Sequence, residues 1–194
     1  MDEVELLIHD MSSTIQPADA YALVLEEKYG TRKLPIIIGA QEAYAIKIAM
    51  TKYRSPRPLT HDLFISLIKK MDVELSKVLI YLVKDGVFYS YLYLKKDVNE
   101  YVLDSRTSDA IALALRYKAP IFTTAQIMDN EYLHEESNGS FSITINMVNI
   151  DILKEELQRA IKEENYEQAS KLRDEIMRRE RSNSDAENNT IIFI

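Results

Sequence analysis

Four polar side chains crowd one short segment of this sequence, and they are of the types that bind or cleave phosphate esters. In LDSRTSDAIALALRYKAP, residues 103–120, Asp104, Arg106, Ser108 and Asp109 directly precede an apolar run typical of a helix. Carboxylates can hold Mg²⁺ or Mn²⁺, and an arginine can bind a phosphate. Asp and Ser are equally common as helix caps, and acids there complement the helix dipole. The segment therefore predicts either a site or a cap.

Residues of matching chemistry occur at two other predicted helix starts. His61 and Asp62 follow Thr60, a predicted N-cap, and Glu42 begins an earlier helical pattern. A histidine can act as a general base, although a lone histidine is more often a surface or packing residue. No D-x-D or HNH-like cluster is present. The functional interpretation takes these residues as a hydrolytic set: catalytic His61, Asp62, Asp104, Arg106 and Asp109, with Glu42, Asp104 and Asp109 as ligands of Mg²⁺ or Mn²⁺.

The elements that would position this set are strands and short helices. Apolar or alternating runs predict strands, a change to helical spacing predicts helices, and Asp85-Gly86 predicts a hairpin. Beyond Pro120, IFTTAQIMDNEYL predicts a short strand or turn and then a helical turn or two. The predicted strands lie at 4–9, 21–30, 33–39, 77–83, 87–97 and 100–104, and the helices near 43–50, 60–71 and 107–118.

The order of these elements indicates an internal duplication. Shifting residues 21–50 by 67 positions aligns them with residues 88–117 without a gap and places Glu42 on Asp109. We therefore predict an α+β fold made of two β3α2 repeats, residues 4–71 and 77–128. Two such repeats tend to be related by a pseudo-twofold axis, which would bring the helix starts at Glu42 and Asp109 together.

The segments LPIIIGAQEAYAI, RPLTHDL, FYSYLYL and LDSRTSDAIALALRYKAPI together resemble the bifunctional nuclease family over about residues 4–128. The resemblance implies two β3α2 repeats in one barrel-like sheet with flanking helices, and nuclease activity on DNA and RNA. The chain departs from the family pattern at Ser90, Ser105 and Thr107, where the family usually has Ala, Ala and Pro. Carried over by motif, the candidate polar residues are Glu42, Arg57, His61, Asp62, Asp104, Arg106, Ser108 and Asp109.

A second resemblance lies at the C-terminus. LKEELQRAIKEENYEQASKLRDEIMRRE, residues 153–180, is similar to the UVR motif of excision-repair nuclease subunits and some chaperone adaptors. Apolar stripes through Leu153 and Leu157, and through Ala169 and Leu172, predict an antiparallel helical hairpin over residues 150–181. Two short helices bury little surface, so we expect the hairpin to dock on a protein partner or on another copy of itself.

The remaining segments complete the predicted organisation. A domain over residues 1–130 is followed by a linker at 131–149, the hairpin at 150–181 and a tail at 182–194 predicted to be disordered. Aromatic residues on both faces of VFYSYLYL predict a homo-oligomer, because one sheet cannot easily bury both faces.

Composition narrows the class of protein. The 194 residues contain no Cys and no long apolar run, and the acidic N-terminus is unlike a signal peptide, which predicts a soluble cytoplasmic protein without a membrane partner. A net charge of −7 argues against non-specific nucleic-acid binding. Two hypotheses remain: a metal-dependent nuclease acting on DNA or RNA with a docking hairpin, and a non-enzymatic binding or regulatory module that docks partners through that hairpin.

Overall fold

The structure is a computed structural model with two described parts, an α+β domain and a C-terminal helical segment. Nearly all of the predicted linker and the whole predicted tail lie outside the described residues. No helix in the described residues is both long and apolar enough to span a membrane. The described residues are 2–11, 20–51, 53, 55–132, 150–167, 169–170, 172–174 and 176–178.

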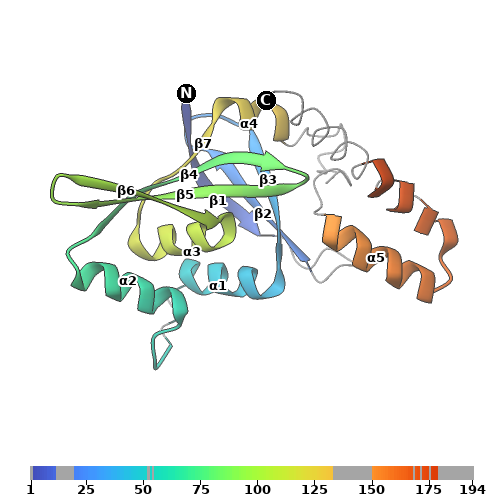
Figure 1. The fold of residues 1–194 in the computed structure, drawn as a ribbon, viewed down its shortest axis with the longest axis horizontal. Helices are drawn as coiled ribbons and strands as arrows, with labels where there is room; N and C mark the ends of the chain where they lie inside the picture. Colours follow the sequence, from blue (N-terminus) through green and yellow to red (C-terminus); the bar gives the residue numbers. More distant parts are fainter. Residues whose placement is uncertain are drawn as a thin grey trace, which may run out of the picture.

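The domain is built on one seven-stranded sheet (Figure 1). Its order is β3-β2-β1-β7-β4-β5-β6, so two antiparallel three-stranded units are joined at the centre by β7. β7 pairs antiparallel with β1 and parallel with β4. The strands are β1 Glu3–Met11, β2 Ala20–Glu27, β3 Lys33–Gly39, β4 Glu74–Lys84, β5 Val87–Lys96, β6 Asn99–Arg106 and β7 Ile121–Thr124.

The sheet is open, which corrects the predicted barrel-like closure. β3 and β6 are the terminal strands, and each pairs with one neighbour only. Pro35 lies within β3 and has no backbone N–H to donate to a further strand, as is typical of edge strands. Seven of the eight residues of β6 are exposed. The sheet therefore ends at these two strands.

Three helices cover one face of the sheet and a fourth lies on the other side (Figure 1). α3, Thr107–Tyr117, is the central helix, with seven residues buried from Thr107 to Ala114. It packs between the sheet and the flanking helices α1, Ala40–Met50, and α2, Thr60–Lys70. α4, Ala125–Glu131, follows β7 and buries Ile127 and Met128. Small alanines in α3 allow this close packing.

The predicted duplication is reproduced in element order but not in strand register. Glu42 and Asp109 are each the third residue of an 11-residue helix that follows the third strand of a meander. In the first hairpin Tyr21 lies opposite Ile38, and an offset of 67 would pair Phe88 with Ser105. Ser105 instead lies opposite Ser90. The two hairpins differ by two residues, and a true duplication stays a prediction.

The C-terminal segment has its own apolar cluster. α5, Ile150–Lys162, contributes Leu153 and Ala160, which are buried with Ala169, Leu172 and Ile176. This cluster is separate from the core of the domain. The packing agrees with the predicted apolar stripes, while an antiparallel hairpin over the whole of 150–181 includes residues outside those described.

Candidate functional site

The segment DSRTSD forms the junction between β6 and α3, and its side chains do not cap the helix. Arg106 is the N-cap residue, with extended backbone angles of φ −61° and ψ 140°, and it makes no side-chain capping bond. Asp109 lies in the first turn, where its charge complements the helix dipole. Its carboxylate is bonded to other side chains, so the segment supplies no side-chain cap, while the predicted placement of an acid near the helix dipole is present.

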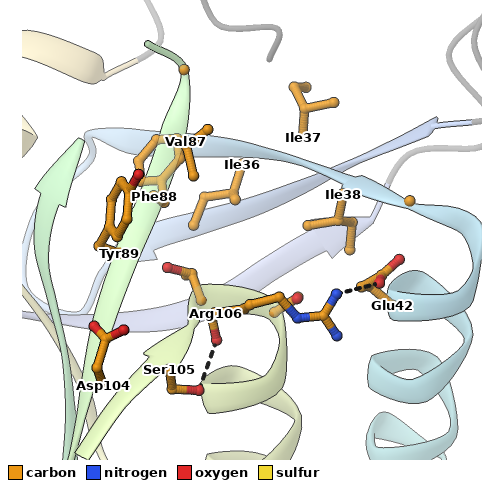
Figure 2. A pocket seen from close by; sticks show the side chains of 14 residues that line it. Ile36, Ile37, Ile38, Glu42, Val87, Phe88, Tyr89, Asp104, Ser105 and Arg106 are labelled. Carbon is orange, nitrogen blue, oxygen red and sulfur yellow. Dashed lines mark hydrogen bonds and ion pairs between the residues drawn. The ribbon is translucent and has the colours of Figure 1, made fainter. Parts of the chain in front are cut away.

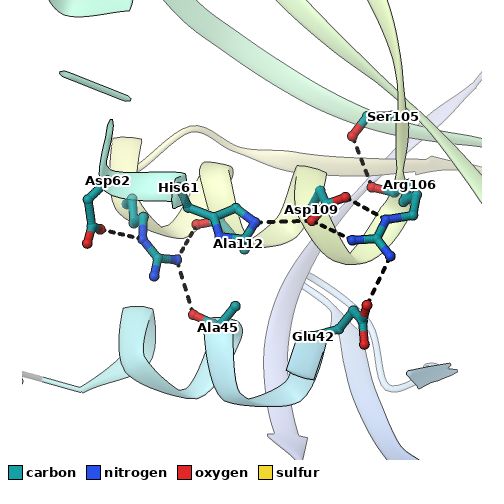
Figure 3. A network of polar contacts seen from close by, with 9 residues as sticks. Glu42, Ala45, His61, Asp62, Ser105, Arg106, Asp109 and Ala112 are labelled. Atoms are coloured by element: carbon teal, nitrogen blue, oxygen red, sulfur yellow. Dashed lines mark hydrogen bonds and ion pairs between the residues drawn. The ribbon is translucent and has the colours of Figure 1, made fainter. Parts of the chain in front are cut away.

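Four side chains from three helix starts form one continuous polar array (Figure 3). Arg106 donates from Nε to Oδ2 of Asp109 at 2.6 Å and from Nη2 to Oδ1 at 3.1 Å, a bidentate pair. Its Nη1 donates to Oε1 of Glu42 at 2.9 Å. On the other side, Nε2 of His61 lies 3.1 Å from Oδ1 of Asp109. We call Glu42, His61, Arg106 and Asp109 the rim array.

The electrostatics of the rim array fix Asp109 as an anion. Burial raises the pKa of the Asp109 carboxyl, but hydrogen bonds from Arg106 and His61 outweigh it, so the pKa lies below its usual value. The hydrogen bond to Asp109 likewise raises the pKa of the Arg106 guanidinium. The Arg106 side chain is 66% exposed, so one surface of this fixed cation faces solvent.

Asp62, the neighbour of His61, has a different role. Its Oδ1 accepts from Nε of Arg116 at 2.7 Å, and its Oδ2 accepts from the backbone amide of Leu59 at 3.0 Å. Burial raises the pKa of Asp62, but the hydrogen bonds from Arg116 and Leu59 have the larger effect, so the pKa lies below its usual value. Leu59, not the predicted Thr60, is the N-cap residue of α2. The reason is that Asp62, in the first turn, supplies the bond to the free amide.

Arg116 was missed by the sequence reasoning. Its side chain is only 8% exposed, and its Nη1 donates to the carbonyls of Ala45 at 3.1 Å and Ala112 at 2.9 Å. Through Asp62, Ala45 and Ala112 it therefore ties α2, α1 and α3 together. A charged residue within the apolar helix pattern was the available signal, because buried arginines need partners.

In the described residues, no hydrogen bond joins the remaining candidates to the array. Asp104 accepts from the hydroxyl of Tyr81 at 3.3 Å, and the Tyr81 ring stacks on that of Tyr91 with centroids 3.8 Å apart. Arg57 is exposed in the segment before α2. Ser108 is buried at the start of α3. The structure thus brings together His61, Arg106, Asp109 and Glu42, and separates Asp62 and Asp104 from them.

The predicted metal ligands do not form a ready ligand group. Among the described residues, no three His, Cys, Asp or Glu side chains gather closely enough to hold a metal ion. Glu42 and Asp109 converge on the Arg106 guanidinium, and Asp104 bonds to Tyr81. A divalent cation between Glu42 and Asp109 would have to displace Arg106. The residues as arranged do not fit a preformed site for Mg²⁺ or Mn²⁺, and metal binding stays a prediction.

A cavity of about 350 Å³ adjoins the rim array (Figure 2). One wall is Ile36, Ile37, Ile38 and Gly39 of β3, and the facing wall comes from the β4–β5 turn and β5. Arg106, Glu42 and the first residues of α3 form its polar end. The cavity thus lies between the two halves of the sheet, and Arg106 belongs both to it and to the array.

Two of the departures from the family pattern compensate each other. The hydroxyls of Ser90 and Thr107 are both buried and hydrogen-bonded at 2.7 Å. A buried hydroxyl without a hydrogen-bond partner destabilises the fold, and here each of the two hydroxyls provides the partner that the other needs. The pair joins β5 to the first residue of α3, next to Arg106.

Comparison with known proteins identifies the family of the chain. Residues 23–136 match the family model of the bifunctional nuclease domain. The chain belongs to this family. Residues 149–181 match the UvrB/uvrC motif. Both family resemblances in the sequence are therefore confirmed.

The relatives of this bifunctional nuclease domain come from bacteria and plants. An uncharacterised protein of Mycobacterium tuberculosis is 37% identical over 113 residues, covering 58% of this chain and 67% of that protein. Bifunctional nuclease 1 of Oryza sativa subsp. japonica is 32% identical over 120 residues, covering 60% of this chain and 36% of its own length. Bifunctional nuclease 2 of Arabidopsis thaliana is 26% identical over 179 residues, covering 80% and 54% respectively. This chain spans only part of the plant proteins.

Proposed function

We propose that this chain hydrolyses phosphodiester bonds in DNA or RNA at the rim array. The observation that supports the proposal best is the connected set of His61, Asp109 and Arg106, which places a histidine, an orienting carboxylate and an exposed guanidinium side by side. The names of the plant relatives, bifunctional nucleases, point to the same reaction.

His61 is the proposed general base. When Asp109 accepts a hydrogen bond from the Nε2–H of His61, the Nδ1 atom carries the free lone pair. Nδ1 can then take a proton from the attacking water while the anionic Asp109 stabilises the imidazolium that forms. The low pKa of Asp109 keeps it charged throughout this step.

Arg106 is the proposed phosphate ligand. A guanidinium has five N–H donors, and three of these are used by Asp109 and Glu42. The two left over are available to the oxygens of a scissile phosphate, on a side chain that is mostly exposed. Charge develops on those oxygens as water attacks, and a fixed cation stabilises it.

The charge of the array supports testing for metal dependence. With neutral His61, two carboxylates and one guanidinium leave the array with a net negative charge, and a phosphodiester is itself an anion. Added positive charge would favour substrate binding. The predicted Mg²⁺ or Mn²⁺ would supply it, and so would a proton on His61. We therefore propose metal dependence as the point to be settled by assay, and no step above depends on it.

The UvrB/uvrC motif is the proposed docking arm. Its small buried cluster is separate from the domain core, which is consistent with a segment that gains stability by packing on a second protein or a second copy.

A non-enzymatic binding module is the second candidate function. One observation favours it: Arg106 is already paired with the carboxylates of Asp109 and Glu42, as in an ion-pair network with a structural role.

The test compares cleavage of labelled DNA and RNA by the purified chain and by His61→Gln, with Mn²⁺ and with EDTA. The proposal expects cleavage by the unchanged chain and a loss of at least a hundredfold in His61→Gln, the usual size of general-base catalysis, roughly 10²–10⁴. His9→Gln is the matched control, because His9 pairs with Glu26 on a different part of the sheet. Absence of cleavage under all conditions would favour the binding module.

A further inference from the structure

We propose that the cavity beside Arg106 holds an unstacked nucleobase, so that the substrate is single-stranded where it is cut. This inference rests on the proposed nuclease function, because it names the substrate class of the same site. It is argued from the position of the cavity, the chemistry of its walls and its junction with the array.

The cavity opens where the two halves of the sheet face each other across a gap. β3 and β6 are the opposite ends of the strand order, yet residues of both line the cavity. Figure 2 shows Ile36–Ile38 facing Val87–Tyr89 across it. An edge strand carries backbone amides and carbonyls that its own sheet does not pair. Such groups can bind the donors and acceptors along the edge of a base.

The walls provide apolar and aromatic surface for a flat ring. Val87 and Tyr89 of β5 stand on one side, and Ile37 of β3 stands on the other. The strand register places Tyr89 directly opposite Arg106. Bases released from a helix are commonly stacked on aromatic side chains and on guanidinium groups. Tyr89 and Arg106 supply one of each.

The polar end of the cavity continues into the rim array. Arg106 lines the cavity and also contacts Asp109, which contacts His61. A nucleotide whose base lies between Ile37 and Tyr89 would therefore have its phosphate next to Arg106. The cavity would then bind the base and the rim array would bind the phosphate of the same nucleotide. A phosphodiester without a base would contact the rim array alone.

The size of the cavity discriminates against duplexes. A volume of about 350 Å³ lies near the lower end of small-molecule sites, roughly 300–1,000 Å³, and suits one nucleotide. In a duplex every base is stacked and paired, and drawing one out costs a few kcal/mol. In a single strand the base is unpaired and this cost is smaller. The cavity is therefore expected to select unpaired nucleic acid.

The first experiment measures binding without chemistry. Isothermal titration compares AMP with ribose 5-phosphate, which carries the same phosphate but no base. AMP is expected to bind at least about tenfold more tightly, in line with the contribution of a base that stacks on an aromatic ring. Val87→Trp should remove this advantage by filling the cavity. Val98→Trp, at a turn where Val98 is 97% exposed, is the matched control and should retain it.

Either of two results would overturn the inference: equal binding of AMP and ribose 5-phosphate, or an advantage of AMP that Val87→Trp leaves intact. If circular dichroism shows that Val87→Trp is unfolded, Tyr89→Leu replaces it, since it removes ring surface instead of adding it. That variant is expected to lose most of the advantage of AMP, and an unchanged advantage would count against the inference.

The second experiment separates this inference from the nuclease proposal. Hydrolysis of bis(p-nitrophenyl) phosphate, a phosphodiester that carries no nucleobase, reports on the rim array alone. Cleavage of one oligonucleotide is measured twice, as a single strand and in a duplex. We expect the single strand to be cut at least tenfold faster, and Val87→Trp to lose that preference. Equal rates on both forms would reject the base cavity while the nuclease function stands. Absence of all hydrolysis would reject the nuclease function, and the binding experiment would then decide on the cavity.

Discussion

The Nε2 atom of His61 lies 3.1 Å from Oδ1 of Asp109, although 48 positions separate the two residues in the sequence. The contact joins the first turn of α2 to the first turn of α3. Arg106 holds the same carboxylate from the opposite side. Asp109 is thus the central member of the array, and its removal should disconnect His61 from Arg106.

Asp109→Asn should abolish cleavage and change stability little. The amide has no charge to stabilise the His61 imidazolium, so the rate should fall at least a hundredfold. The lost ion pair involves a mostly exposed arginine, and such pairs contribute about 0.2–1 kcal/mol. The melting temperature should therefore fall by only a few degrees, as measured by circular dichroism.

Asp72→Asn is the matched control for this change. Asp72 is exposed and has a positive φ of 54°, which Asn tolerates well. It should cleave like the unchanged chain. If Asp109→Asn instead unfolds and the folded fraction keeps full specific activity, Asp109 is a structural residue only.

Arg116→Met should lower stability more than any change in the exposed part of the array. It removes the hydrogen bonds to Ala45 and Ala112 and leaves Asp62 without its main partner. The free energy of unfolding should fall by roughly 2–4 kcal/mol in urea titration. Lys70→Met, at an exposed position of α2, should change it by less than about 0.5 kcal/mol. Equal effects of the two changes would show that Arg116 does not hold the helices together.

Stability should depend on pH through Asp109 and Asp62, whose pKa values are both lowered in the folded chain. In the unfolded chain an aspartate has a pKa of about 3.9, so near and just below that pH the unfolded chain binds more protons than the folded chain does. The stability contributed by the two carboxylates is therefore fully present above about pH 4 to 5 and is lost as pH falls through the folded pKa values. The double change Asp62→Asn and Asp109→Asn should flatten the acid limb of a plot of urea midpoint against pH. An unaltered acid limb would mean that other groups govern it.

A homo-oligomer stays a prediction, and the structure suggests which surface to test. β5 turns Phe88 and Leu92 into the core and leaves its tyrosines half-buried on the other face. α2 and its C-cap residue present three apolar side chains to solvent: Leu63 at 62% exposed, Leu67 at 53% and Met71 at 52%. Light scattering should give a mass of at least twice 22.4 kDa, and Leu67→Glu should reduce it. Ser66→Glu adds the same charge beside the stripe and should keep the larger mass. A monomeric unchanged chain would disprove the prediction.

The C-terminal cluster should unfold without the domain. Leu172→Asp places a charge among Leu153, Ala160 and Ile176, so amide hydrogen exchange in residues 150–178 should become fast. Hydrolysis of a small phosphodiester by the rim array should be unchanged. Met177→Asp, on a residue 47% exposed, is the control and should leave exchange as it was. Lost hydrolysis in Leu172→Asp would mean that the two clusters depend on each other.

Sequence patterns predicted helices and strands best where the spacing of apolar residues stays regular over a whole element. Strands β1 to β6 and helices α1 to α3 lie close to their predicted positions, because alternation and helical spacing continue over seven to eleven residues there. β7 has only four residues, which is too short for a pattern, so its place at the centre of the sheet could not be predicted. The predicted closure of the sheet was wrong because the register and curvature of a sheet depend on strand pairing, which the periodicity of the sequence does not encode.

The site was partly predictable for the same reason. Glu42, His61, Arg106 and Asp109 were singled out by residue type at helix starts, and the structure brings them together. Residue type could not distinguish Asp62, which bonds to Arg116, from His61 beside it. Nor could it show that Ser90 and Thr107 contact each other, because that pairing spans β5 and α3.

The place of β7 in the strand order has a consequence for synthesis of the chain on the ribosome. β1–β2–β3 and β4–β5–β6 are each made in order, and among the described strands β7 is the one that pairs with a strand of each unit. A nascent chain that has not yet emerged beyond Ile121–Thr124 therefore carries two separate meanders. We expect the gap between β3 and β6, and with it the cavity beside Arg106, to reach its final width once this late strand joins the two units. The site would then form only when synthesis of the domain is nearly complete.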